Sequence, residues 1–298
     1  MAARLQKVST LAIVAAAMLW VSYFLLRDQA VWAGLGVLAF PIGFSAFLAG
    51  EFLLLAWVQS HAGSHRATAR QLMQAWWKEV LTTPRVFCWQ QPFRSKREPD
   101  SVPDSVTSRR GVVFVHGFFC NRGLWNPWMA SLRSMGVPFV AVNLEPVFGS
   151  IDNYAEIIEA AVRRLELVTT LAPVVIAHSM GGLAVRVWLR RDDNTSRVHR
   201  VVTIGTPHRG TWLARFGHTV NGKQMRINSA WLEQLSHSDG HDRYAKFTCV
   251  YSNCDNIVFP FETATLPGAQ NLHVAGIAHV QLAFHALTLP EIRMWILP

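Results

Sequence analysis

The chain has 298 residues, a formal net charge of +9 and a hydrophobic content of 51%. This length and apolar content are sufficient for one domain of about 200 residues with a large core, plus an appendage. The positive charge fits a domain held against an anionic membrane surface, and no recognition motif supports a nucleic-acid partner. The four cysteines lack the spacing of a zinc site, and we expect free thiols.

Two long apolar stretches lie near the N-terminus. Val8 to Leu26 contains no charged residue, and neither does Ala30 to Gly50, which continues past Glu51 into Phe52 to Val58. Each stretch is long enough to cross a hydrocarbon core of about 30 Å. The sequence therefore predicts two transmembrane helices in residues 1–60, joined by a turn at residues 27–29.

The basic residues around these stretches predict their orientation. Arg4 and Lys7 precede the first stretch, while Arg66, Arg70 and Lys78 follow the second. Positive charge on both outer flanks favours placing both ends in the cytoplasm. A cleavable signal peptide is the alternative for the first stretch, but the apolar run continues without a convincing cleavage site. We expect a multi-pass protein of the inner membrane with the domain that follows these stretches on the cytoplasmic side.

Residues 61–110 form a connecting region of mixed character. His65 to Leu81 has apolar residues at helical spacing, including two tryptophans, with polar residues between them. This pattern predicts an amphipathic helix that lies in the membrane interface or packs on the following domain, and the sequence leaves both open. Arg85 to Phe93 is interpreted as a short strand, and Arg94 to Arg110 as an exposed linker.

Short β-branched or apolar runs alternate with helical segments from Gly111 onward. The clearest helices are Asn153 to Leu171 and Leu183 to Arg191. This alternation predicts one domain, residues 111–298, with a mostly parallel sheet covered by helices on both faces. The expected strands are Val112–Val115, Phe139–Leu144, Val174–Ala177, Val201–Ile204, Phe247–Ser252 and Asn271–Val274.

Ser179 lies in a strand, turn and helix sequence typical of a catalytic nucleophile. The strand ends at Ala177, His178 and Ser179 follow, and Gly181 allows a sharp turn into the next helix. Small residues are needed two positions before and after the serine, because those positions come close together in such a turn. The backbone N–H of Met180 then points to the place where an oxyanion forms.

Residues of three other segments complete this arrangement. His116, Gly117 and Phe118 follow the strand Val112–Val115, and the N–H of Phe118 is the candidate for the second oxyanion donor. Asp255 follows one later strand and His279 follows the next. Because ligands bind beyond the carboxyl ends of parallel strands, we expect these residues to meet Ser179.

Several of these segments resemble the α/β-hydrolase lipases and esterases. Ala177 to Gly182, Ala-His-Ser-Met-Gly-Gly, resembles the nucleophile elbow of small bacterial lipases, with Ala177 where the usual pattern has glycine. His116-Gly117 is similar to the oxyanion loop of that family. Gly205 to Gly210 is similar to a segment common after the next strand. The resemblance covers Gly111 to the C-terminus and implies an α/β-hydrolase fold, preceded here by the transmembrane helical hairpin.

The resemblance implies a serine hydrolase that cleaves carboxylic esters, either lipids or other acyl esters near the membrane, without a cofactor. Ser179 would attack, His279 would act as base and acid, and Asp255 would orient His279. A thioesterase or acyltransferase uses the same triad, so these activities remain open. The alternative from another class is a non-catalytic interaction protein with a hydrolase fold.

Other polar residues are weaker candidates. His273 lies in an expected strand and His285 in an expected helix, so both are interpreted as structural. Asp239 and Asp242 precede a strand instead of following it, and together with nearby histidines they match no metal-ligand pattern, so we expect no metal. Thr211 to Lys246 is a long insertion, and a lid over the site and ordinary surface helices are both open.

Overall fold

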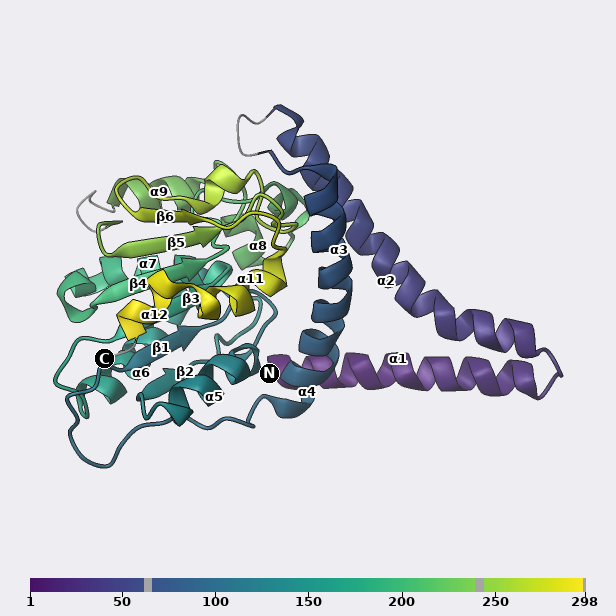
Figure 1. Ribbon diagram of the computed structural model, residues 1–298, viewed down its shortest axis with the longest axis horizontal. Helices are drawn as coiled ribbons and strands as arrows, with labels where there is room; N and C mark the ends of the chain where they lie inside the picture. Colours follow the sequence, from purple (N-terminus) through teal and green to yellow (C-terminus); the bar gives the residue numbers. More distant parts are fainter. Residues whose placement is uncertain (62–65, 239–243, 297–298) are drawn as a thin grey trace.

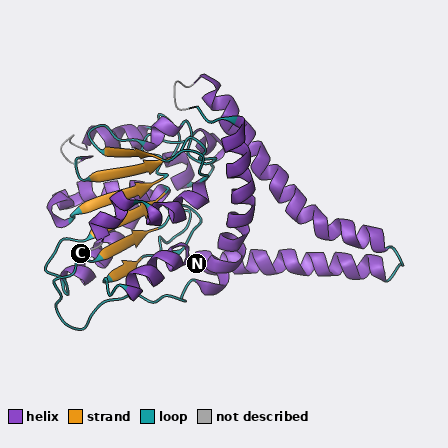
Figure 2. Ribbon diagram, in the orientation of Figure 1, coloured by secondary structure: helices purple, strands orange, loops and turns teal. Residues whose placement is uncertain are grey.

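The computed structural model describes residues 1–61, 66–238 and 244–296. Its centre is a six-stranded sheet in the order β2-β1-β3-β4-β5-β6, in which all neighbouring strands are parallel. Figure 2 shows the sheet with helices on both sides. The strands are β1 (Val112–Val115), β2 (Phe139–Ala141), β3 (Val174–His178), β4 (Arg200–Ile204), β5 (Phe247–Tyr251) and β6 (Gln270–His273).

The inner strands are continuous, largely β-branched apolar runs, because helices cover both of their faces and exclude water from both. One face packs under α6 (Ala155–Glu166), α7 (Met180–Arg190) and α9 (Ala230–Ser238). The other face packs under α5 (Asn126–Ser134), α11 (His279–His285) and α12 (Pro290–Ile296). A short helix, α8 (Val220–Gln224), precedes α9. The predicted fold class is confirmed, and the strand ends differ from those expected by at most a few residues.

The N-terminal stretches form α1 (Ala2–Leu25) and α2 (Ala30–Val58), both long and apolar enough to cross a membrane. Large side chains that are exposed along them include Leu19, at 72%, and Val31, at 75%. Figure 1 shows the two helices meeting at a distant turn and diverging toward the sheet. Helix α1 begins before the apolar stretch, and the side chain of Gln6 in its first turns contacts Gln91 and Phe119.

The predicted amphipathic helix is α3 (Ala69–Pro84), which begins with a capping box between Thr68 and Gln71. Figure 1 shows α3 running across the space between the diverging helices and the carboxyl ends of the strands. Its Ala75 and Glu79 are buried toward the catalytic domain, while Met73 and Trp77 are exposed on another side. The helix thus packs on the domain and keeps an exposed apolar face.

The strand expected at Arg85 to Phe93 is wrong. The chain continues from α3 into a π-helical segment, Arg85–Gln90, and then α4 (Gln91–Arg94). Burial of Val86 and of Gln90, four residues later, favours a helix here. The side-chain N–H of Gln90 donates to the carbonyl of Gly123 at 2.6 Å, a contact between distant segments that no local pattern shows.

Candidate active site

Ser179 stands at a sharp turn between β3 and α7. Its φ of +54° and ψ of −131° lie in a region that non-glycine residues seldom adopt, and the surrounding structure must hold it there. Its N–H donates to the carbonyl of Ile204 at 2.8 Å, and its carbonyl accepts from the hydroxyl of Thr206 at 2.9 Å. The segment after β4 therefore supports this turn.

Two glycines let the backbones approach closely around Ser179. A Cβ at Gly117 would lie 2.7 Å from the Cβ of Ser179, and a Cβ at Gly181 would lie 2.6 Å from the carbonyl oxygen of His116. Real side chains do not tolerate such distances. The loop after β1 thus lies directly against the turn at Ser179, while the Ala177 side chain is completely buried in β3.

Asp255 and His279 form a buried pair. Both carboxylate oxygens of Asp255 lie 2.9 Å from Nδ1 of His279. Asp255 is fixed from its other side by the N–H groups of Ile257 and Val258, which donate to Oδ1 at 2.9 and 2.7 Å. Because Nδ1 faces a carboxylate, it carries the proton and leaves Nε2 as the acceptor. His279, expected in a loop, is the first residue of α11.

The electrostatic surroundings differ for the two histidines near Ser179. Burial opposes the charged form of His279, but the charge and hydrogen bond of Asp255 outweigh it and raise the pKa of His279. Burial holds the pKa of His178 well below its ordinary value, so this ring is neutral. The two rings lie 4.6 Å apart, and Nε2 of His178 donates to the carbonyl of His279 at 3.2 Å. His178 thus contacts His279 while staying neutral.

His116 orients the loop that carries Phe118. The N–H of Leu144 donates to Nε2 of His116 at 3.0 Å, so the proton lies on Nδ1, which donates to the carbonyl of Gly117 at 2.9 Å. Burial lowers the pKa of His116 to about 4, which keeps it neutral. In a trans peptide the N–H points opposite to the carbonyl, so this bond directs the N–H of Phe118 away from His116.

Met180 supplies the second N–H. It is the first residue of α7, and the first N–H groups of a helix have no partner within the helix. The helix dipole adds partial positive charge at the same point. The N–H groups of Met180 and Phe118 therefore remain the two candidates for binding an oxyanion.

Ser179 and His279 open into a cavity of about 620 Å³, a size typical of sites for small ligands (about 300–1,000 Å³). The loop after β1 contributes Phe118 and Phe119, whose rings lie 6.4 Å apart. The N-terminal helices and the segment after α3 contribute Phe44, Phe47, Leu48, Glu51, Glu79, Thr83 and Phe87. The other lining residues come from the segment after β1, the end of β3, the loop after β5 and the start of α11, and they are Gly117, Cys120, Leu124, His178, Asn256, Ile257 and Val280.

The N-terminal helices contact three of the loops that build the site. From α1, the side-chain N–H of Gln6 donates to the carbonyl of Phe119 at 2.8 Å. From α2, a carboxylate oxygen of Glu51 accepts from Asn256 at 2.6 Å, and Asn256 in turn accepts from the N–H of His279 at 3.2 Å.

From α3, Glu79 contacts the start of α11. Its carboxylate accepts from the N–H of Val280 at 2.9 Å, directly after His279. Glu79 is 1% exposed, and this burial raises its pKa to about 7. Each of the three N-terminal helices therefore holds one segment of the candidate site through a polar side chain.

The weaker candidates do not join the site. His273 lies in β6 and His285 at the end of α11. Asp239 and Asp242 lie outside the described residues. In the described part of 211–246, no residue lines the cavity, and Leu232 and Leu235 of α9 pack in the core beside α7. Helices α2 and α3 line the cavity, and for the insertion the lid and the surface helices both remain predictions.

A family model of the α/β hydrolase family matches residues 112–284, more than half of the chain. The chain belongs to the α/β hydrolase family. The matched residues include the whole sheet, the turn at Ser179 and the pair Asp255 and His279. The N-terminal helices lie outside the match.

Solved structures support the same fold for this α/β hydrolase. Lipase BlEst2 of Bacillus licheniformis in its mature form has a TM-score of 0.57 at 18% identity, covering 66% of this chain and 96% of that one. Lipase B of Aspergillus fumigatus has a TM-score of 0.55 at 20% identity, covering 64% of this chain and 54% of that one. This hydrolase thus spans about half the length of the Aspergillus enzyme.

Sequence reasoning missed Gln6, Glu51 and Glu79 as parts of the hydrolase site. A signal existed for Glu51, which is a carboxylate inside an otherwise uncharged apolar stretch. Glu79 lies among the apolar positions of an amphipathic helix, so only its burial sets it apart. Nothing local identified Gln6, whose partners lie more than 80 residues away.

Proposed function

We propose that this protein is a membrane-anchored serine hydrolase that cleaves carboxylic esters through Ser179, His279 and Asp255. One observation carries the proposal: the buried Asp255 and His279 pair lies at the same cavity as a serine held at positive φ. Strained backbone at a cavity and a carboxylate-oriented imidazole are together typical of an activated nucleophile. The similarity to lipase structures supports the fold, and the contacts around Ser179 and His279 support the proposed reaction.

The proposed reaction has two steps. Nε2 of His279 takes the hydroxyl proton as the oxygen of Ser179 attacks the ester carbon, and the tetrahedral oxyanion is stabilised by the N–H groups of Phe118 and Met180. Each donor contributes about 3 kcal/mol to the lowered barrier. When the carbon–oxygen bond to the alcohol breaks, His279 returns the proton to the leaving oxygen. Water then repeats the sequence on the acyl-enzyme, releasing the acid and restoring Ser179.

Labelling with a fluorophosphonate tests this function. We expect the wild-type protein to be labelled and to hydrolyse p-nitrophenyl butyrate, and Ser179→Ala to lose both. Ser134→Ala, at the exposed end of α5, is the matched control and should behave as wild type. An unlabelled wild-type protein would support the non-catalytic alternative, and equal labelling of Ser179→Ala would show that another residue reacts and overturn the role of Ser179.

We also infer that α1 and α2 anchor the enzyme as a transmembrane hairpin. The start of α1 lies against the catalytic domain, where the N-terminal amine pairs with Glu145 and Gln6 is buried. A hairpin that crosses a bilayer therefore keeps its N-terminus and the domain on one side. The basic flanks favour the cytoplasmic side.

Reporter fusions at the C-terminus test this orientation. A cytoplasmic domain gives a fluorescent fusion when the reporter folds only in the cytosol, and an inactive fusion when the reporter is an alkaline phosphatase that requires the periplasm. An active phosphatase fusion would place the domain on the opposite side.

A further inference from the structure

The wall of the catalytic cavity is largely built by the helices that we assign to the membrane. Phe44, Phe47 and Leu48 of α2 form one side, and Thr83 of α3 with Phe87 of the following turn forms another. The carboxylates in the lining are engaged by the protein, Glu51 by Asn256 and Glu79 by the N–H groups of α11. What remains facing the cavity is chiefly aliphatic and aromatic surface, suited to a hydrocarbon chain.

This apolar wall is continuous with the outer surface of α2. Leu48 is 4% exposed inside the cavity, whereas Phe47 lines the cavity and is 65% exposed. Phe44 also lines the cavity, and its ring lies 6.5 Å from that of Phe40, which is exposed one turn closer to the distant hairpin turn. An apolar path therefore runs along α2 from the surface we assign to lipid to the neighbourhood of Ser179.

Helix α3 places this path at the level of the membrane interface. Met73, Trp77 and Leu81 are each more than half exposed along α3. A helix with such an apolar face beside a hairpin lies in the interface with that face toward the acyl chains. Figure 1 shows α3 crossing between the diverging α1 and α2. The side of the cavity formed by α2 and α3 thus faces the bilayer.

We propose that the substrate is a bilayer-resident lipid with a long ester-linked acyl chain, which enters sideways along α2 and extends that chain between α2 and α3. The proposal rests on the proposed function and adds the substrate class and the entry route. Phe44, Phe47, Leu48, Thr83 and Phe87 form the acyl site. The ester carbonyl then lies beside Ser179, and a soluble ester lacks the contacts that this wall provides.

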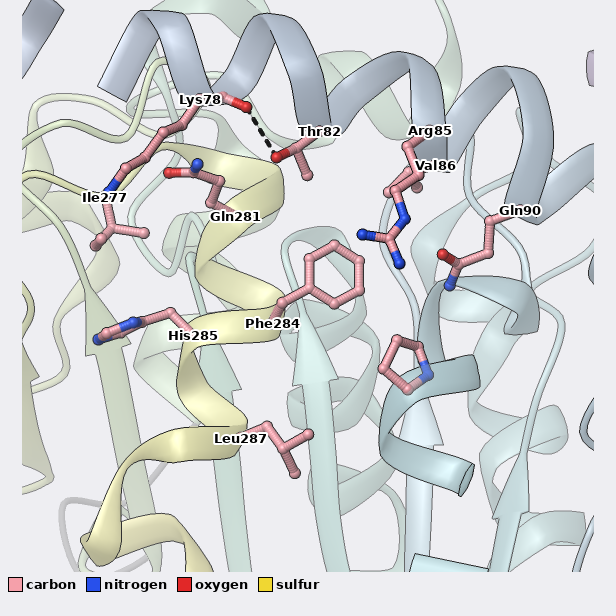
Figure 3. Close-up of a pocket in the computed structure, with 11 residues that line it drawn as sticks. Lys78, Thr82, Arg85, Val86, Gln90, Ile277, Gln281, Phe284, His285 and Leu287 are labelled. Atoms are coloured by element: carbon pink, nitrogen blue, oxygen red, sulfur yellow. Dashed lines mark hydrogen bonds between the residues drawn. The ribbon is translucent and has the colours of Figure 1, made fainter. Parts of the chain in front are cut away.

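A second cavity, of about 520 Å³, provides a control position for testing the acyl site. Figure 3 shows it between α3 and α11, with Lys78, Thr82 and Arg85 on one side and Phe284 and His285 on the other. None of the proposed catalytic residues lines it. Adjacent threonines of α3 therefore line different cavities. The hydroxyl of Thr82 donates to the carbonyl of Lys78 at 2.8 Å, whereas the buried hydroxyl of Thr83 has no partner within the described chain.

The first experiment compares Thr83→Phe with Thr82→Phe in the full chain, reconstituted in vesicles. The vesicles contain phosphatidylethanolamine, phosphatidylglycerol and palmitoyl-bearing diacylglycerol, and p-nitrophenyl butyrate serves as the short soluble ester. Released fatty acid is measured by mass spectrometry, and melting temperatures in detergent check folding. We expect the wild type to release palmitate, and the ratio of palmitoyl to butyryl activity to fall at least tenfold in Thr83→Phe and to stay unchanged in Thr82→Phe.

The outcomes separate this inference from the proposed function. Ser179-dependent hydrolysis of the soluble ester without release of any vesicle fatty acid overturns the substrate class and leaves the hydrolase standing. An equal activity ratio in the two folded variants overturns the acyl site. Absence of Ser179-dependent cleavage of both substrates overturns the proposed function, and the inference with it.

The second experiment tests the route. Isotopically labelled palmitoyl diacylglycerol is placed either in the vesicles that contain the enzyme or in separate protein-free vesicles mixed with them. Sideways entry predicts hydrolysis at least tenfold faster when enzyme and lipid share a bilayer. Equal rates in the two arrangements would show access from the aqueous side and overturn entry along α2.

Discussion

In the family domain, the residues proposed to react are set by the sheet: Ser179, Asp255 and His279 each follow the end of a strand. In the N-terminal helices, the residues at the same cavity are mostly hydrophobic, and their polar members bind backbone or amide groups of the catalytic loops. The two regions thus divide the site. In our proposal, the family domain carries the reacting groups, and the N-terminal helices form the approach for the substrate and support the loops.

The largest expected effect comes from the domain side of this division. Asp255→Asn should lower kcat by about 10⁴-fold, because an amide no longer holds His279 in the required tautomer. In the wild type, kcat/KM should rise with pH through the pKa of His279, because His279 must be neutral to act as base. Asp255 holds this pKa above its ordinary value. The variant loses the carboxylate charge, so this rise should move to lower pH. A rise at an unchanged pH in the variant would contradict this origin of the shifted pKa.

A glycine in the oxyanion loop should give the next largest effect. Gly117→Ala places a Cβ 2.7 Å from that of Ser179, and the displacement should reduce kcat/KM by about 10²-fold. Gly43→Ala is the control in α2, where no atom lies within 4 Å of the added Cβ. Similar losses in both variants would mean that the effect comes from general destabilisation.

Buried Glu79, in α3, should contribute to the free energy of unfolding. Its pKa is raised to about 7 by burial, so the folded protein binds this proton more tightly than the unfolded chain does. The free energy of unfolding should therefore fall as pH rises from about 4.5 to about 7, by at most about 3 kcal/mol from this group. Glu79→Gln removes that contribution, and melting temperatures in detergent from pH 5 to pH 8 should show a flatter dependence. If the melting temperature of Glu79→Gln depends on pH as steeply as that of the wild type, the raised pKa of Glu79 is not the cause of the dependence.

The smallest effect is expected at α1. Gln6→Ala removes the donor to the carbonyl of Phe119 and the acceptor for the side-chain N–H of Asn121, a loss of about 1 kcal/mol for each hydrogen bond, and should lower kcat by less than tenfold. Thr10→Ala is the control, because its hydroxyl bonds only to the carbonyl of Gln6 within the same helix. A variant of Gln6 with unchanged kcat would restrict the role of α1 to anchoring.

The same division separates what sequence could predict from what it could not. Runs such as Val112–Val115 and Val174–His178 signal buried parallel strands by themselves, and the order of the candidates along the chain follows from the fold. The proposed roles of Ser179, Asp255 and His279 remain predictions, although the structure brings Asp255 and His279 into contact.

Contacts between distant segments were beyond such reasoning. Glu79 meets Val280, about 200 residues later, and no periodicity reports such a pairing. The apolar run around Val86 is too short to separate a buried helix from a strand, and its packing decides the outcome. The insertion after β4 has the composition of a lid, yet only the tertiary arrangement shows that α2 and α3 border the cavity.

A small cluster joins the N-terminal helices to the catalytic loops, with Phe52 and Leu55 of α2 and Ala75 of α3 packed against Phe259 and Ala278. Removing the first 68 residues would strip α1 and α2 from the chain and uncover the part of this cluster that Phe52 and Leu55 pack against. If the proposals above hold, a shortened protein of this kind would lose substrate contacts and loop support as well as its anchor. Low activity of the shortened protein would therefore not distinguish loss of the membrane anchor from damage to the candidate site. Point substitutions in the full chain separate these two effects.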